Sequence, residues 1–264
     1  MSELITLDNL HQVIETNKLI KEEITQIVHD FNKKYEKFKK FSHEKISFSI
    51  LRENHLIQIP IDDKYWGGAI IKKDKLKIPV INTAQPRVYQ YFVAWHEIYH
   101  LLYDLNLNEG THNITIDMEL NERKADYFAA KMIFNNNLYE YYYSIEDDYF
   151  LNKIIKCMDV FKAPYKAVLV ELFEKAALEY NDLKLQQDIV SHFDNKPNLI
   201  EKFKELELDL ELIQPSYVIS FGGLEKTIEE QIRCCPDETF HLDNYEFLSR
   251  LKNKIEEILG EYVP

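Results

Sequence analysis

The chain has few cysteines and no long apolar run. Its three cysteines, Cys157 and the adjacent Cys234 and Cys235, show no Cys-x-x-Cys spacing, so neither a disulfide framework nor a cysteine-bound metal is predicted. No stretch of about 18 or more apolar residues predicts a membrane-spanning helix. The first residues lack the basic start and continuous apolar segment of a signal peptide. We therefore expect a cytoplasmic protein.

Positive charge is also scarce, because 32 lysines and arginines face 45 acidic residues and give a formal net charge of −13. Such an excess repels phosphates and anionic lipids unless basic residues gather on one face. The densest basic cluster, at residues 33–40, is interrupted by Glu36 and falls on a predicted helix, which favours a solvated face. We expect neither direct nucleic-acid binding nor membrane binding. The sequence leaves the oligomeric state open.

The hydrophobic pattern predicts an α+β fold that is mainly helical. A content of 45% hydrophobic residues over 264 positions is enough for one substantial core. Apolar positions at helical spacing over residues 5–41 predict one or two amphipathic helices. Alternating apolar positions at 46–50, 56–61, 70–71 and 76–81 predict a small, largely antiparallel sheet. Helical patterns dominate the remaining sequence.

The predicted strand at 76–81 contains Pro79. Proline cannot donate a hydrogen bond to a neighbouring strand, so this strand is predicted at an edge of the sheet. An exposed edge can accept an extended peptide as an added strand.

Two helices follow the predicted sheet. The first starts near Pro86, continues to Leu105 and stops by Gly110. The second runs over about 115–134 and ends in a loop rich in asparagine. The tract at 138–150, rich in tyrosine and acidic residues, is interpreted as a partly buried connector, with a lid over a cleft as the alternative.

Residues 96–100, in the first of these helices, read His-Glu-Ile-Tyr-His. His96 and His100 are about one helical turn apart, so both imidazoles lie on one face and can bind a single metal ion. Glu97 is placed beside them to act as the catalytic base. Taken alone, each histidine is better interpreted as a core residue of an amphipathic helix, so further residues must support the site.

The second helix supplies them, because Glu122 and Asp126 are also one turn apart. A hydrolytic zinc site takes three protein ligands and leaves the fourth position to water, and two histidines with a glutamate form one such set. We predict His96, His100 and Glu122 as zinc ligands, although the same ligands accept Mn2+ or Fe2+. Asp126 is predicted to lie behind His96 and orient its ring.

Two assignments stay open in the sequence. Glu119 and Glu109 are alternative third ligands, ranked below Glu122 because only Glu122 is followed by an acidic partner one turn later. A donor that stabilises the oxyanion is also needed in principle. The sequence does not choose among the candidates Tyr139, Tyr141, Tyr142, Tyr143, His112 and His192.

Over residues 66–175 the chain resembles the ImmA/IrrE family of metallopeptidases, and more broadly the thermolysin-like zinc peptidases with a glutamate third ligand. The resemblance rests on Trp66-Gly67-Gly68-Ala69-Ile70, Ile81-Asn82, the segments 87–102 and 122–130, and 161–172. Tyr99 stands where the family commonly has glycine, and Pro164 where it commonly has a small residue.

Family membership would imply a zincin-like peptidase core, with His96, His100 and Glu122 as zinc ligands and Glu97 as base. It would also imply an intracellular endopeptidase that cuts a helix-turn-helix transcriptional repressor. Residues 1–180 would form the peptidase domain, including the N-terminal helix. Residues 181–264 would be a mostly helical region of unknown role.

Two further hypotheses compete with the endopeptidase. In the first, the protein is a catalytically silent member of the fold that binds a protein partner as a regulatory module. In that case Glu97→Gln would change nothing measurable. The weaker alternative is an aminopeptidase, which needs an acidic group to hold a free amine near the metal, and the sequence singles none out.

Overall fold

The computed structural model describes residues 5–38, 40–104, 110–113 and 119–262. Within these residues the fold is α+β, as predicted, with eleven α-helices and a small sheet. The first part of the chain forms α1 (Leu7–Lys34), the 3-10 helix η1 (Glu36–Phe38), α2 (His43–Glu53), β1 (Ile57–Ile59), β2 (Gly68–Lys73), β3 (Leu76–Asn82), α3 (Arg87–Leu102), β4 (Gly110–Asn113) and α4 (Leu120–Phe134).

Helices dominate the rest of the chain. They are α5 (Leu138–Ser144), α6 (Phe150–Phe161), α7 (Tyr165–Leu178), α8 (Leu183–His192), α9 (Leu199–Glu205), the 3-10 helix η2 (Leu210–Ile213), α10 (Leu224–Cys234) and α11 (Phe240–Tyr262), with the two-residue strand β5 (Ser220–Phe221) between η2 and α10. The 138–150 tract forms α5 and a connector, and α5 packs against α6 and α7.

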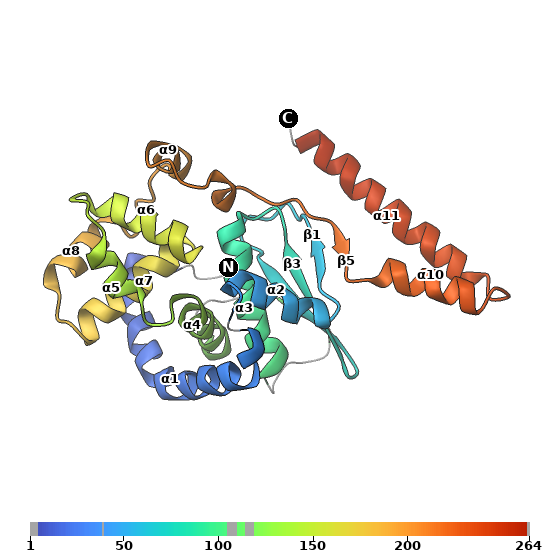
Figure 1. The fold of residues 1–264 in the computed structure, drawn as a ribbon, viewed down its shortest axis with the longest axis horizontal. Helices are drawn as coiled ribbons and strands as arrows, with labels where there is room; N and C mark the ends of the chain where they lie inside the picture. Colours follow the sequence, from blue (N-terminus) through green and yellow to red (C-terminus); the bar gives the residue numbers. More distant parts are fainter. Residues whose placement is uncertain (1–4, 39, 105–109, 114–118, 263–264) are drawn as a thin grey trace.

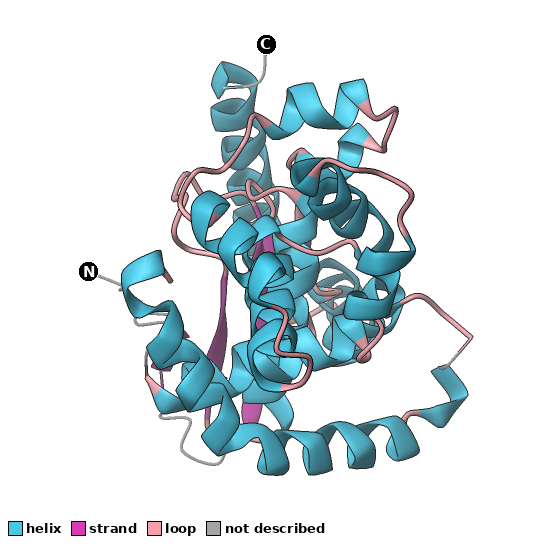
Figure 2. Cartoon of the chain, turned by 90° about the vertical axis from the view of Figure 1, so that its left-hand side faces the viewer, coloured by secondary structure: helices cyan, strands magenta, loops and turns pink. Residues whose placement is uncertain are grey.

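The sheet has the strand order β4-β2-β3-β1-β5. Only β1 and β3 are parallel, and the other three pairings are antiparallel, so the prediction of a largely antiparallel sheet is confirmed. Helix α3 packs on this sheet against β2 and β3. The ribbon shows the strands in the middle of the molecule, with the α4 to α8 helices on one side and the α10–α11 hairpin on the other (Figure 1). A view turned by 90° shows the narrow sheet surrounded by helices (Figure 2).

The predicted edge position of the 76–81 strand is wrong, because β3 has β2 on one side and β1 on the other. Pro79 is nevertheless accommodated. The three residues of β1 pair with β3 only from Val80 to Asn82, so at Pro79 the strand is paired with β2 alone. A substrate peptide therefore cannot add to β3 as a new strand along Val80 and Ile81.

The strand predicted at 46–50 is also wrong, because these residues belong to α2. Helix α2 buries Ser47, Phe48, Ile50 and Leu51, which lie on one helical face. Over so few residues, apolar positions at 46, 48 and 50 fit a strand as well as a helix. The helix was expected to stop by Gly110, but α3 ends at Leu102 and Gly110 begins β4. This strand escaped prediction because Gly-Thr-His-Asn carries no apolar alternation.

The core beneath the sheet joins α1, α3 and α4. Trp95, fully buried on α3, meets Phe31 of α1 and Phe128 of α4 in edge-to-face contacts. These large rings fix how α3 and α4 face each other, because aromatic side chains bury large areas in specific geometries. The packing of α3 on α4 positions the candidate metal ligands.

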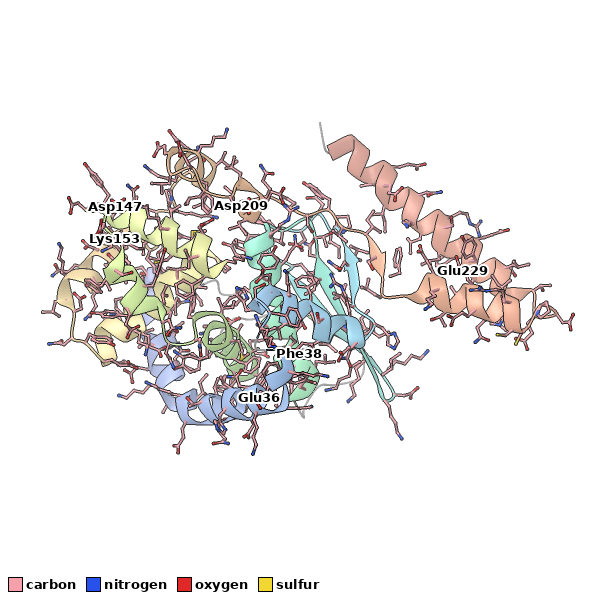
Figure 3. The ribbon with its side chains drawn as sticks, in the orientation of Figure 1. Glu36, Phe38, Asp147, Lys153, Asp209 and Glu229 are labelled. Carbon is pink, nitrogen blue, oxygen red and sulfur yellow. The ribbon has the colours of Figure 1, made fainter. Side chains whose placement is uncertain are left out.

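The C-terminal helices α10 and α11 pack on each other as a hairpin. Many of their side chains are exposed, including Glu229 on α10 (Figure 3) and the large apolar Phe240 and Phe247 on α11. The hairpin is joined to the body through β5, which pairs with β1. None of the helices among the described residues has the length and apolarity needed to span a membrane.

Candidate metal centre

Three of the predicted site residues meet between α3 and α4. His96 and His100 come from the last turns of α3, and Glu122 from the first turn of α4. Their side chains are 2%, 0% and 1% exposed. Among the described residues, these three form a cluster that could hold a metal ion, because their ligand atoms all lie within 4.8 Å of one another.

The distances within this triad fit a tetrahedral ion. The Nε2 atoms of His96 and His100 are 3.1 Å apart. Glu122 places one carboxylate oxygen 3.2 Å from the first and the other 3.4 Å from the second. Ligands about 2.0 to 2.1 Å from a tetrahedral zinc ion lie about 3.3 Å from each other. The triad therefore encloses a space of the right size with two nitrogen donors and one oxygen donor.

Both imidazoles are oriented by a carboxylate at their other nitrogen. The Nδ1 of His96 lies 2.8 Å from Asp126, and the Nδ1 of His100 lies 3.0 Å from Asp104. A carboxylate only accepts, so each Nδ1 carries the proton and each Nε2 presents a lone pair toward Glu122. Acceptor atoms this close repel one another unless a metal ion or a proton lies among them. The arrangement is that of a cation site.

The charges around His96 act in the same direction. Burial alone lowers the pKa of His96, but hydrogen bonds to Asp126 and Glu122 and their negative charges raise it well above its ordinary value. A field that stabilises an added proton on this ring also stabilises a divalent cation beside it. Asp126 was predicted from its spacing to Glu122, whereas Asp104 was missed, although it follows His100 by four residues.

Glu97 is fully buried, and the start of β2 lies against it. A Cβ atom on Gly68 would come within 3.0 Å of a Glu97 carboxylate oxygen and within 2.7 Å of the Val80 carbonyl oxygen. Gly68 therefore allows the strand to approach the side chain of Glu97. Gly67 is tight for a different reason, because a Cβ atom there would come within 2.7 Å of the Val93 side chain.

The alternative ligands and donors fall elsewhere. Glu119 is exposed at the start of α4 and does not join the triad, and Glu109 lies outside the described residues. Tyr139 and Tyr143 both bind Asp182, away from the metal centre, and Tyr141, Tyr142 and His192 do not line the cleft described next. The side chain of His112 is likewise outside the described part of the chain. The oxyanion donor stays unassigned.

A cleft of about 530 Å³ leads to the triad, with His96 and Asp126 in its wall. One face of α3 provides Tyr89, Phe92, Val93 and His96, at the spacing of one helical stripe. The facing walls come from α4 and α7 and from the loop before β2, through the residues Arg123, Asp126, Tyr127, Ala130, Ala167, Val170, Glu171, Lys64, Tyr65 and Gly67. Its lining combines apolar side chains with a few charged ones, as in sites that bind organic ligands or peptides.

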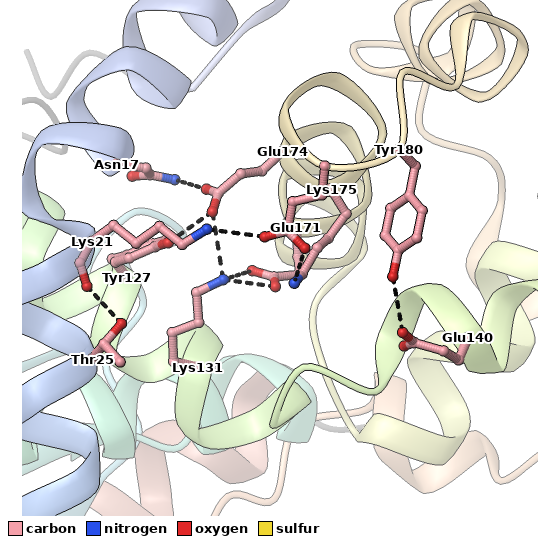
Figure 4. Close-up of polar contacts among 11 residues, drawn as sticks. Asn17, Lys21, Thr25, Tyr127, Lys131, Glu140, Glu171, Glu174, Lys175 and Tyr180 are labelled. Atoms are coloured by element: carbon pink, nitrogen blue, oxygen red, sulfur yellow. Dashed lines mark hydrogen bonds and ion pairs between the residues drawn. The ribbon is translucent and has the colours of Figure 1, made fainter.

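A buried polar network continues from the metal centre into the body, and the sequence did not predict it. Arg123 donates to Asp126 at 2.8 Å and to Asn17 of α1 at 3.1 Å. Asn17 in turn donates to Glu174 of α7 at 2.8 Å, and Glu174 also accepts from Tyr127 at 2.7 Å (Figure 4). The one available sequence signal was Asn17, a polar residue within the apolar stripe of α1.

The same network contains two buried carboxylates on α7. Lys131 of α4 contacts both oxygens of Glu171, at 2.8 and 2.9 Å, and lies 3.5 Å from Glu174. One lysine of α4 thus contacts both buried carboxylates of α7 (Figure 4). Burial raises the pKa of Glu171 against the attraction of Lys131.

No protein-family model matches the chain, and neither curated proteins nor solved structures give a significant match. The resemblance to ImmA/IrrE metallopeptidases therefore rests on the motif residues alone. The structure supports its coarser content, a buried triad of His96, His100 and Glu122 that could hold a metal ion.

Proposed function

We propose that the protein is a zinc-dependent endopeptidase that hydrolyses a peptide bond of an intracellular protein. The observation that carries the proposal is the convergence of His96, His100 and Glu122 at tetrahedral spacing, with Glu97 between the two histidines on α3 and a cleft opening beside His96. The ligand set of two nitrogens and one oxygen favours zinc, and Mn2+ or Fe2+ are the alternatives.

In the proposed reaction, a bound zinc ion supplies a Lewis acid and lowers the pKa of a water molecule. His96, His100 and Glu122 hold the ion, and Asp126 and Asp104 keep both imidazoles in the tautomer that binds metal. Glu97 accepts the proton of the attacking water and passes it to the leaving amine. Its burial against Gly68 keeps the carboxylate in one position.

The substrate side of the proposal has two parts. The cleft between α3, α4 and α7 has a volume of about 530 Å³, a size that takes a ligand larger than one amino acid, which favours an endopeptidase over an enzyme for free amino acids. By resemblance to the ImmA/IrrE family, the substrate is a helix-turn-helix transcriptional repressor. Residues 1–180 would carry the catalytic site. The region 181–264 has no assigned role, although Lys196 of that region lines the cleft.

The test is metal content by elemental analysis, measured on wild type, Glu122→Ala and Glu97→Gln purified without added metal. We expect about one zinc per chain in wild type and in Glu97→Gln, and a loss of metal in Glu122→Ala, because Glu122 is one of the three ligands and Glu97 is not. Glu119→Ala, a change of the same kind at the exposed end of α4, is the matched control and should keep the metal. Wild type without metal would refute the proposal.

The second measurement separates the enzyme from a binding module. Zinc-loaded wild type and Glu97→Gln are incubated with unfolded protein substrates and with a co-expressed repressor. Cleavage by wild type that is lost in Glu97→Gln supports the endopeptidase. Retained metal and partner binding with no cleavage in either protein would instead identify a catalytically silent module.

A further inference from the structure

The cleft beside the metal centre is electrically polarised along its length. At the metal end lie the carboxylates of Glu122 and Asp126. At the other end, where α3 begins, the cleft is lined by Lys64, Lys196 and the Gln85-Pro86 segment. The N-terminus of α3 adds partial positive charge there, because a helix dipole points its positive end toward its first turn.

The lysines at this end differ from the other cations in the cleft wall. Arg123 and Lys166 are each paired with a carboxylate, Asp126 and Asp194, at 2.8 Å. Among the described residues, Lys64 and Lys196 have no carboxylate within salt-bridge distance and lie instead over aromatic rings. The Nζ atom of Lys196 is 5.7 Å from the ring centre of Tyr89, and that of Lys64 is 4.8 Å from Tyr65.

Lys64 and Lys196 are thus the cations lining the cleft that have no carboxylate partner among the described residues. Lys196 is exposed as a residue, and partial burial of its ammonium group lowers its pKa. An anionic ligand would supply the missing charge.

The distance between Lys196 and the metal centre can be estimated from the positions of Tyr89 and His96 on α3. Tyr89 and His96 lie seven residues apart on α3, which at about 1.5 Å per residue is about 10 Å. An extended peptide covers about 3.3 Å per residue, so about three residues separate the two ends. Between them the cleft is apolar, with Phe92, Val93 and Val170 in its walls.

We propose that this cleft selects substrates with a carboxylate two to three residues from the scissile bond and an apolar side chain between them, and that Lys196, assisted by Lys64, binds the carboxylate. The inference rests on the proposed peptidase function and names its substrate class. The carboxylate can come from an aspartate or glutamate side chain or from the end of a peptide chain. Lys196 is a specificity residue in this proposal, and the metal site does not depend on it.

The experiment measures binding, so it is independent of turnover. Fluorescein-labelled octapeptides are based on alanine and carry one leucine and one glutamate at separations of one to five residues, with an amidated C-terminus. The first control peptides carry glutamine in place of glutamate. The second carry no acidic side chain and have a free C-terminal carboxylate. Kd values are measured by fluorescence polarisation with the zinc-loaded Glu97→Gln protein, at low and at high salt.

The expected result is a preference for glutamate over glutamine of about three- to tenfold, as for one partly desolvated ion pair. It should be confined to separations that place the carboxylate two to three residues from the metal end, and it should weaken at high salt. The preference should disappear in Lys196→Glu and shrink in Lys196→Gln. Lys184→Glu changes the net charge equally at an exposed position outside the cleft and should keep it.

Equal binding of the glutamate and glutamine peptides, or an unchanged preference in Lys196→Glu, would overturn the inference. A preference limited to peptides with a free C-terminus would identify the chain end as the source of the carboxylate. Failure of the proposed function has a different signature, because zinc-loaded wild type would then leave the preferred peptides uncut while their charge-dependent binding persisted.

Discussion

His100 and Asp104 form a hydrogen bond of 3.0 Å between Nδ1 and a carboxylate oxygen, the same relationship that His96 has with Asp126 at 2.8 Å. The two acidic residues come from different segments. Asp126 belongs to α4, whereas Asp104 follows the end of α3 and is only 7% exposed. Each imidazole of the triad is thus oriented from behind by its own carboxylate, and the pair of contacts yields the first prediction.

Asp104→Ala should weaken zinc binding by about 10- to 100-fold, the usual range when the partner of a metal-bound histidine is removed. Without Asp104, the ring of His100 can rotate and can carry its proton on Nε2, where it cannot bind metal. Competition with a chelator of known zinc affinity measures the change. Asp237→Ala, in the exposed segment between α10 and α11, should leave the affinity unchanged. An unaltered affinity in Asp104→Ala would remove Asp104 from the metal site.

Gly68→Ala should lower peptidase activity with little loss of metal. The new methyl group would meet the Val80 carbonyl oxygen at 2.7 Å, Val93 at 2.8 Å and Glu97 at 3.0 Å, so either β2 or the side chain of Glu97 must move. Overpacking of this kind typically destabilises a protein by about 1–3 kcal/mol. Gly260→Ala is the control, because nothing lies within 4 Å of its added Cβ. Activity, metal content and the urea midpoint are compared, and full activity in Gly68→Ala would contradict the assigned role of this contact.

The triad itself could be predicted from the sequence because helical periodicity is local. A spacing of four residues places two side chains on the same face of a helix, independently of the rest of the chain. His96 and His100 have this spacing, and so do Glu122 and Asp126. Only the meeting of the two helices required the fold. Asp104 obeyed the same spacing rule within the predicted helix, but it lies outside the His-Glu-Ile-Tyr-His motif.

The parts that could not be predicted depend on contacts distant in sequence. The strand order places β3 between β1 and β2, and no local property of Pro79 reveals that β1 stops pairing before it. The link from Arg123 to Asn17 joins residues 106 positions apart. Lys196 reaches the cleft from the loop between α8 and α9, and only the three-dimensional arrangement puts it beside Tyr89.

Asn17 and Arg123 should be energetically coupled. Arg123→Leu removes the donor to one carboxylate oxygen of Asp126 and the donor to Asn17, and Asn17→Ala removes contacts to both Arg123 and Glu174. Each change should therefore destabilise the protein by about 1–3 kcal/mol or more. In the double variant the losses should overlap, with a coupling energy of about 0.5–3 kcal/mol. Urea unfolding of the four proteins measures it. Simple additivity would show that the network does not act as a unit.

His43 should make stability fall in mild acid. Its Nε2 lies 2.9 Å from the carbonyl oxygen of Phe161, and its Nδ1 accepts a weaker bond from Trp95 at 3.4 Å, so the folded state holds the neutral ring. Burial lowers the pKa of His43 below its ordinary value, although Glu44 nearby opposes the shift. Below pH 6.5 the unfolded chain therefore binds a proton that the folded state does not, and the stability contributed by His43 is lost as the pH falls toward its folded pKa. Wild type should therefore exceed His43→Gln in urea midpoint by less at pH 5.5 than at pH 7.5. The contribution of the buried His96 to the pH dependence is the same in both proteins and cancels in the difference. His29→Gln, at an exposed position, should show no such change, and a constant gap for His43→Gln at both pH values would mean that His43 is not kept neutral by the fold.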